Sequence, residues 1–94
     1  MSEKKVRAHI LISGKVQGVF FRAETQKAAK RHNVSGWVRN KSNGTVEALI
    51  EGKEKDVALI LEWCKTGSPL SKVKNIDIRW GDYQGEFSDF TISY

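Results

Sequence analysis

The sequence predicts an α+β fold in which a four-stranded sheet carries two helices on one face. The first observation is the order of hydrophobic patterns along the chain: strand, helix, strand, strand, helix, strand. The second is the Asn43-Gly44 pair, which separates the two middle strands as a hairpin turn does. The third is size, because 94 residues, 39% of them hydrophobic, suit a single domain over residues 1–94.

The first half of the chain contains a strand and a surface helix. Residues 6–13 alternate, with Val6, Ala8, Ile10 and Ile12 on one side. Residues 22–33 (RAETQKAAKRHN) are rich in helix-favouring residues. One narrow stripe of this helix would face the core, formed by Phe21, Thr25, Ala28, Ala29 and His32.

The middle of the chain, residues 36–42 and 45–51, reads as a β-hairpin with two possible registers. A two-residue turn would place Val38 opposite Leu49, whereas a three-residue loop ending in a left-handed glycine places Val38 opposite Ala48. The second register gathers the apolar residues on one face, and we therefore prefer it. Asn40 then lies opposite Val46, at the end of its strand and on the core-facing side.

The second half repeats the pattern of the first. Residues 53–65 (KEKDVALILEWCK) have the spacing of a buried helical stripe at Val57, Ile60, Leu61 and Cys64. Gly67 and Pro69 end this helix. Residues 73–80 alternate through Ile76, Ile78 and Trp80, and FSDFTISY forms a short strand at the C-terminus.

Two successive strand–helix–strand units joined by a hairpin are typical of the ferredoxin-like βαββαβ fold. Right-handed crossovers give the sheet order 4-1-3-2, counting strands along the chain, with both helices on one face. The loop after the first strand and the end of the second then lie on the same rim of the sheet, about 10 Å apart. Arg22 and Asn40 can therefore meet over one small ligand.

The loop between the first strand and first helix, GKVQGVFFR at residues 14–22, has the features of an anion site. Gly14 and Gly18 allow successive backbone amides to turn inward, and the loop leads into a helix N-terminus, which favours negative charge. Arg22 adds a planar fork of donors suited to phosphate. The predicted phosphate-binding residues, acting mainly through their amides, are Lys15, Val16, Gln17, Gly18, Val19, Phe20 and Phe21.

Two motifs carry a family resemblance. GKVQGVFFR matches G-x-V-Q-G-V-x-F-R, and GWVRNKSNGTVEALIEG (36–52) matches G-[FYW]-V-[KR]-N-x-x-x-G-x-V, then five further residues and Gly. The chain thus resembles the acylphosphatases over essentially its whole length. The resemblance implies metal-independent hydrolysis of acyl phosphates to carboxylate and inorganic phosphate, without a cofactor. It also implies that Arg22 binds the substrate phosphate and that Asn40 positions the attacking water.

The residue types at this site fit that reaction. Neither motif places Asp, Glu, His or Cys where it could act as a general acid. An acyl phosphate does not need one, because its leaving group is a carboxylate whose conjugate acid has a pKa of about 4 to 5. Holding the phosphoryl group, neutralising its charge and orienting water is what remains for the protein to do.

Charge and composition leave two rival functions to weigh. The net charge of +5 favours anionic partners, and RNA-binding domains of this fold stack bases on aromatic residues of the third strand. The corresponding segment here, TVEALIEG, has no aromatic residue and two glutamates, so we expect no nucleic-acid partner. A non-catalytic phosphate-sensing or regulatory module of the same fold stays open as the alternative.

The cysteine content and the N-terminal sequence indicate the compartment in which the protein works. Cys64 is the single cysteine, which excludes an intramolecular disulfide and a cysteine-rich metal site. The N-terminus has neither the pattern of a signal peptide nor the length of a membrane span. We therefore expect a cytoplasmic protein with no membrane partner. Because no long apolar face is left over, we also expect a monomer.

Overall fold

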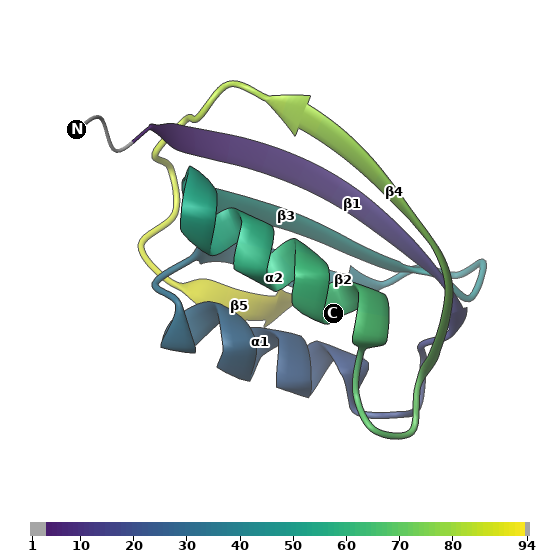
Figure 1. The fold of residues 1–94 in the computed structure, drawn as a ribbon. Helices are drawn as coiled ribbons and strands as arrows, with labels where there is room; N and C mark the ends of the chain where they lie inside the picture. The colour runs from purple at the N-terminus through teal and green to yellow at the C-terminus, as the bar shows by residue number, and fades with distance from the viewer. Residues whose placement is uncertain (1–3, 94) are drawn as a thin grey trace.

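The computed structural model describes residues 4–93, in which two helices cover one face of a five-stranded sheet (Figure 1). The elements are β1 (Lys5–Lys15), α1 (Phe21–Arg31), β2 (Ser35–Asn40), β3 (Val46–Lys53), α2 (Glu54–Thr66), β4 (Lys72–Gly81) and β5 (Phe90–Ser93). The predicted ferredoxin-like fold with a short C-terminal strand is confirmed. Its strands and helices begin and end within a few residues of the predicted bounds.

The sheet order is β4-β1-β3-β2-β5, which contains the predicted order 4-1-3-2. The sequence left the terminal strand without a partner, and the structure pairs β5 in parallel with β2, with Gly36 opposite Phe90. The Phe90 side chain is fully buried, so β5 closes the side of the core beside α1.

The β2–β3 hairpin has the preferred one of the two registers. Val38 pairs with Ala48 and Asn40 with Val46, so Asn40 is the last residue of its strand. The main-chain amide of Lys41 donates to the carbonyl of Thr45 over 2.8 Å, which leaves a three-residue loop ending at Gly44 with φ 90°. The glycine supplies the backbone conformation that this loop length requires.

The hydrophobic core lies between the sheet and the helices. The predicted stripe of α2 is buried at all of its positions, which are Val57, Ile60, Leu61 and Cys64. Burial raises the pKa of the Cys64 thiol to about 12. Trp80 is the exception to the predicted alternation, because it lies on the edge strand β4 and is 56% exposed, while Ile76 and Ile78 pack against the core.

The opposite face of the sheet carries two buried carboxylates on β3. Glu51 is fully buried and accepts hydrogen bonds from Arg7 Nη1 at 3.0 Å and from the amides of Gln84 at 2.7 Å and Gly85 at 3.2 Å. It thereby holds the connection between β4 and β5 against this face.

No helix within residues 4–93 is long and apolar enough to cross a membrane.

Candidate active site

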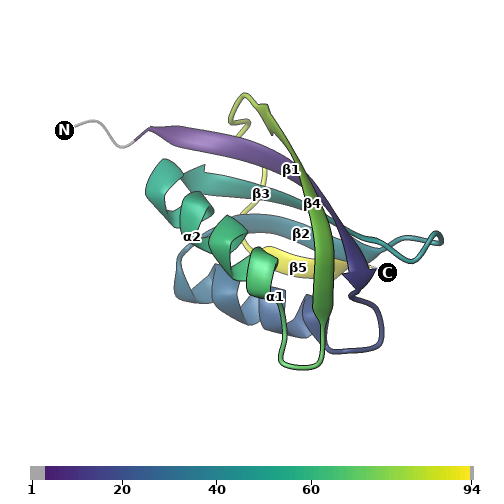
Figure 2. The same ribbon diagram turned by 45° about the vertical axis from the view of Figure 1, so that its right-hand side comes forward.

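A cavity of about 250 Å³ lies where β1 leads into α1. The β2–β3 hairpin turns at the same end of the sheet (Figure 2). The walls of the cavity come from the β1–α1 loop, the first turn of α1, the end of β2 and β5. The lining residues are Val16, Gly18, Phe20, Phe21, Arg22, Ala23, Asn40 and Ile92. The structure therefore brings Arg22 and Asn40 to one cavity, as the sheet order predicts.

The N-terminus of α1 forms one wall of this cavity. The first helical hydrogen bond joins the amide of Glu24 to the carbonyl of Phe20 over 3.0 Å, so the amides of Phe21 and Ala23 have no acceptor within the helix. Serine, threonine or aspartate at the N-cap usually satisfies one of these amides, but here the N-cap is Phe20 and makes no side-chain cap bond. These amides and the helix dipole are therefore available to an anion in the cavity.

Arg22 adds a full positive charge beside these amides. Its side chain is partly exposed and lines the cavity from the first turn of α1. The one acidic residue of that turn, Glu24, is paired with Lys27 at 3.2 Å on the same helix. The cavity wall thus combines a guanidinium with main-chain donors, a set that matches the oxygens of a phosphoryl group.

Asn40 faces these donors from the end of β2. It lies in the same alternation as Gly36 and Val38, which both face the helices and are buried. Its Oδ1 atom is buried and accepts no hydrogen bond from the residues that the structure describes. A buried acceptor without a donor is rare and costly, so this atom calls for a bound water or ligand group.

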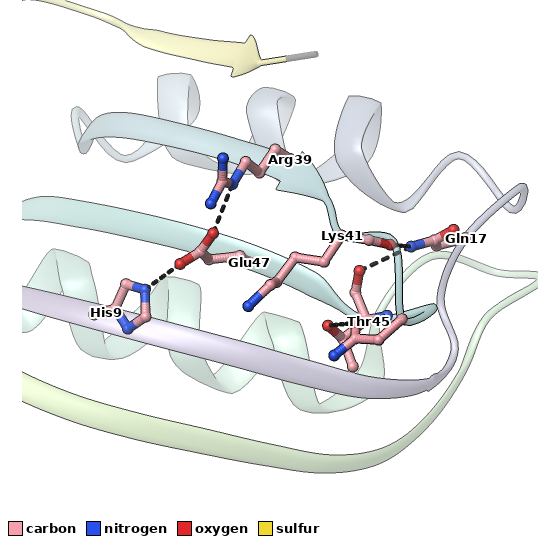
Figure 3. Close-up of polar contacts among 7 residues, drawn as sticks. His9, Gln17, Arg39, Lys41, Thr45 and Glu47 are labelled. Atoms are coloured by element: carbon pink, nitrogen blue, oxygen red, sulfur yellow. Dashed lines mark hydrogen bonds and ion pairs between the residues drawn. The ribbon is translucent and has the colours of Figure 1, made fainter.

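Gln17 connects the two halves of the site through its side chain (Figure 3). Its Nε2 atom donates to the main-chain carbonyl of Lys41 at 2.7 Å and to that of Thr45 at 2.9 Å. Lys41 directly follows Asn40, so this pair of bonds ties the β1–α1 loop to the hairpin that carries Asn40. The motif glutamine therefore serves as a clamp between loops, a side-chain role that the sequence did not indicate.

The predicted anion cradle is only partly at the cavity. Val16, Gly18, Phe20 and Phe21 line it, whereas Lys15, Gln17 and Val19 do not. Phosphate binding by the amides of these three residues stays a prediction.

Lys15 pairs with Lys72 in the β1–β4 ladder, and the carbonyl of Val19 accepts a 2.7 Å hydrogen bond from the hydroxyl of Ser68.

Sequence reasoning missed two residues that line the cavity, Ala23 and Ile92. Ala23 could have been found, because the third residue of a helix still carries an unpaired amide. Ile92 could not have been placed without knowing that β5 pairs with β2.

On the opposite face of the sheet, Glu47 holds Arg39, the residue before Asn40 (Figure 3). Arg39 Nε donates to Glu47 Oε1 at 2.6 Å, and His9 Nε2 lies 2.6 Å from Glu47 Oε2. Burial alone would raise the pKa of the Glu47 carboxyl, but the hydrogen bonds and charges of His9 and Arg39 outweigh it and lower that pKa. Side chains on this face therefore fix the strand that presents Asn40 on the other.

The donors around the cavity suit an anion better than a cation. They are a guanidinium, a carboxamide and main-chain amides, with no carboxylate, imidazole or thiol among the lining residues. Within residues 4–93 no group of three or more His, Cys, Asp or Glu side chains could hold a metal ion.

Comparisons with known proteins agree on one family. The family model described as Acylphosphatase matches residues 8–92. An acylphosphatase of Pelotomaculum thermopropionicum is 47% identical over 90 residues, which cover 96% of this chain and 98% of that protein. The crystal structure of the Bacillus subtilis acylphosphatase has a TM-score of 0.92 and 37% identity, covering 95% of this chain and 99% of that one. The Coxiella burnetii acylphosphatase structure has a TM-score of 0.90 and 34% identity, covering 99% and 100%.

Proposed function

Because this chain belongs to the acylphosphatase family and hydrolyses acyl phosphates to carboxylate and inorganic phosphate, we propose that Arg22 and Asn40 are its catalytic residues. Arg22 and the amides of the β1–α1 loop hold the phosphoryl group, and Asn40 orients the attacking water. The assignment depends on one observation: the Oδ1 atom of Asn40 is buried with no donor among the described residues, and Asn40 lines the same cavity as Arg22.

The phosphoryl group is held at the N-terminus of α1. The main-chain amides at the start of α1 and the guanidinium of Arg22 donate to its oxygens and stabilise the charge that builds there during transfer. The main-chain amides of residues 15–21 form the proposed phosphate-binding segment. Four residues of this segment line the cavity, which supports the proposal: Val16, Gly18, Phe20 and Phe21.

Water is oriented by Asn40. Its Oδ1 accepts a hydrogen bond from the water, which satisfies the otherwise unpaired atom and directs an oxygen lone pair toward phosphorus. A carboxamide is too weak a base to deprotonate the water early, so the proton passes to an oxygen of the substrate's own phosphate. The P–O bond to the acyl group breaks, and its electrons leave on the carboxylate without a proton from the protein.

The experiment is to measure acetyl phosphate hydrolysis and its inhibition by inorganic phosphate in Arg22→Ala, Arg22→Lys and Asn40→Ala. Losing one oriented donor costs about 3 to 4 kcal/mol in the transition state, so Arg22→Ala lowers turnover at least about a hundredfold. Arg22→Lys loses nearly as much, because the ammonium cannot reproduce the fork.

Asn40→Ala loses turnover and keeps phosphate inhibition, since Asn40 contacts the water rather than the phosphate. Phosphate inhibition that disappeared in Asn40→Ala would overturn this division of roles.

We propose that the reaction needs neither a metal nor a cofactor, which is tested by assaying the purified protein with acetyl phosphate or benzoyl phosphate in excess chelator. Turnover that continues supports the metal-independent mechanism, whereas activity abolished by the chelator rejects it. Tight phosphate binding without turnover would instead be the result expected of the phosphate-sensing module that the sequence left open.

We further propose that the chain works as one domain over residues 1–94, as a monomer in the cytoplasm. The family match over residues 8–92 supports the single domain. Cys64 is a free cysteine, and chains without disulfides are usual in a reducing compartment. The large exposed apolar side chains are spread over several elements, which favours a monomer. Buried Glu47 and Glu51 on the sheet face disfavour nucleic acid.

A further inference from the structure

Phe20 is placed unlike the other phenylalanines near the site. Its side chain is 73% exposed, and its backbone has φ 62° and ψ 20°, the left-handed region. That conformation is uncommon for any residue with a side chain and unfavourable for a bulky one. The next residue, Phe21, is 1% exposed and packs against Trp63 with ring centroids 5.5 Å apart. Phe21 therefore supplies the apolar contact that the fold needs here.

The fold gains little from the Phe20 ring. A side chain that is mostly in water contributes little hydrophobic stabilisation. Phe20 is also the N-cap of α1, where its side chain cannot accept a hydrogen bond from a helix amide. Strained residues of this kind cluster at functional sites. Phe20 lines the cavity shared by Arg22 and Asn40, so its location points to a ligand.

The cavity has a polar and an apolar side. Arg22, Asn40 and the amides at the start of α1 form the polar side, which holds the phosphoryl group in the proposed function. Phe20 and the partly buried Ile92 are apolar lining residues from two different segments. Because the Phe20 ring is mostly exposed, it lies at the mouth, where the acyl group of a bound acyl phosphate leaves the polar pocket.

We propose that Phe20, assisted by Ile92, is a specificity-determining residue that binds the acyl group and favours substrates with an aromatic or extended apolar acyl chain. This inference rests on the proposed function, since the acyl group points to the mouth only when the phosphoryl group lies at Arg22. The cavity of about 250 Å³ is smaller than a site for a drug-sized ligand. It suits a phosphoryl group with the acyl substituent resting on the rim.

The expected selectivity is modest. An aromatic side chain gains roughly threefold to tenfold in affinity from a well-placed ring contact. Acetyl phosphate carries a single methyl group and gains little from such a contact. The ratio of kcat/KM for benzoyl phosphate to that for acetyl phosphate therefore isolates the contribution of Phe20.

The test measures this ratio in the wild type, Phe20→Ala and Phe20→Trp, with Leu70→Ala as the matched control. Leu70 is 64% exposed, lies in the neighbouring loop between α2 and β4, and is outside the residues that line the cavity. Phe20→Ala removes the ring but keeps a Cβ atom at position 20. We expect its ratio of kcat/KM values to fall about threefold to tenfold, mainly through KM for benzoyl phosphate. Phe20→Trp keeps a high ratio, and Leu70→Ala leaves it unchanged.

Acetyl phosphate turnover and inhibition by inorganic phosphate report separately on the phosphoryl pocket. Phe20→Ala keeps the main-chain amide of residue 20, so we expect any loss with acetyl phosphate to be smaller than the loss with benzoyl phosphate. An unchanged substrate ratio in Phe20→Ala overturns the inference, and so does an equal loss for both substrates. Failure of the proposed function is a different result, namely Arg22→Ala retaining wild-type turnover of acetyl phosphate.

Discussion

Replacing Gln17 by alanine tests whether the two loops of the site must be held together. The substitution removes two hydrogen bonds, from Gln17 Nε2 to the carbonyl of Lys41 at 2.7 Å and to that of Thr45 at 2.9 Å. Neither carbonyl is left without a donor, because Lys41 also accepts from Gly44 N at 3.2 Å and Thr45 from Lys41 N at 2.8 Å. The loss is therefore the net value of two bonds, about 1 to 3 kcal/mol in unfolding free energy, with no added penalty for a buried orphan.

The effect on turnover has a different origin. Lys41 follows Asn40, so releasing the hairpin from Gln17 lets Asn40 move relative to Arg22. A displacement of about 1 Å can cost up to a hundredfold in rate, and we expect kcat of Gln17→Ala to fall at least about tenfold. Phosphate inhibition is kept, because the amides at the start of α1 do not depend on the hairpin. Gln17→Ala should thus resemble Asn40→Ala rather than Arg22→Ala.

The assay combines urea unfolding with steady-state hydrolysis of benzoyl phosphate, and Gln26→Ala is the matched control. Gln26 Nε2 also donates to a main-chain carbonyl, that of Phe90 at 3.0 Å, but Gln26 does not line the cavity. We expect Gln26→Ala to lose about 0.5 to 1.5 kcal/mol of stability with kcat unchanged. A stable Gln17→Ala with normal kcat would refute the positioning role. So would a further tenfold loss of kcat when Gln17→Ala is added to Asn40→Ala, because the clamp acts through Asn40.

Two other predictions concern the scaffold around the site. Glu47→Gln should destabilise the protein by about 1 to 2 kcal/mol at pH 7, since it removes a charged acceptor from His9 and Arg39. Because the folded-state pKa of Glu47 is lowered, its stabilisation is present above the ordinary value of 4.5 and is lost as the pH falls through the folded-state pKa. In urea unfolding, the difference in unfolding free energy between Glu47→Gln and wild type should be smaller below pH 4 than at pH 7. A difference that grows on acidification would contradict this reasoning. Gly36→Ala should cost at least about 2 to 4 kcal/mol, because Gly36 has φ 136° and an added Cβ would lie 1.8 Å from the carbonyl oxygen of Leu49. Gly81→Ala, where the nearest atom is Arg7 Cδ at 4.0 Å, is the control and should be close to neutral by thermal unfolding.

The sequence was sufficient to predict the structure wherever only one arrangement placed the apolar residues together on one face. The hairpin register follows from gathering Val38, Ala48 and Val46 on one face, and the structure has that register. Placing Asn40 on the rim shared with the β1–α1 loop needed only this register and right-handed crossovers. The cavity that Arg22 and Asn40 both line is the result.

The remaining features depend on long-range contacts that no local pattern encodes. The short segment that forms β5 is amphipathic, but its alternation does not specify which sheet edge it joins. Gln17 gave no signal either, because an amide side chain in a glycine loop can turn to a ligand or to a neighbouring loop. Its partners are two main-chain carbonyls more than twenty residues away, and such groups are invisible in a sequence.

Glu51 shows how such long-range contacts reach the site. Strand alternation puts Glu51 on the face away from the helices, where a carboxylate is ordinarily in water. Instead it is fully buried, because the β4–β5 connection crosses that face and donates the amides of Gln84 and Gly85 to it. Arg7 Nη1 bonds both Glu51 and Glu86, and so ties the same connection to β1. This connection delivers β5 to the edge of β2, and β5 contributes Ile92 to the cavity. This cluster of Arg7, Glu51 and Glu86 on the far face of the sheet therefore helps to place Ile92, whereas Phe20 and Arg22 are placed by the β1–α1 loop and the first turn of α1. Substitutions in the cluster should consequently change the ratio of kcat/KM for benzoyl phosphate to that for acetyl phosphate more than they change inhibition by inorganic phosphate.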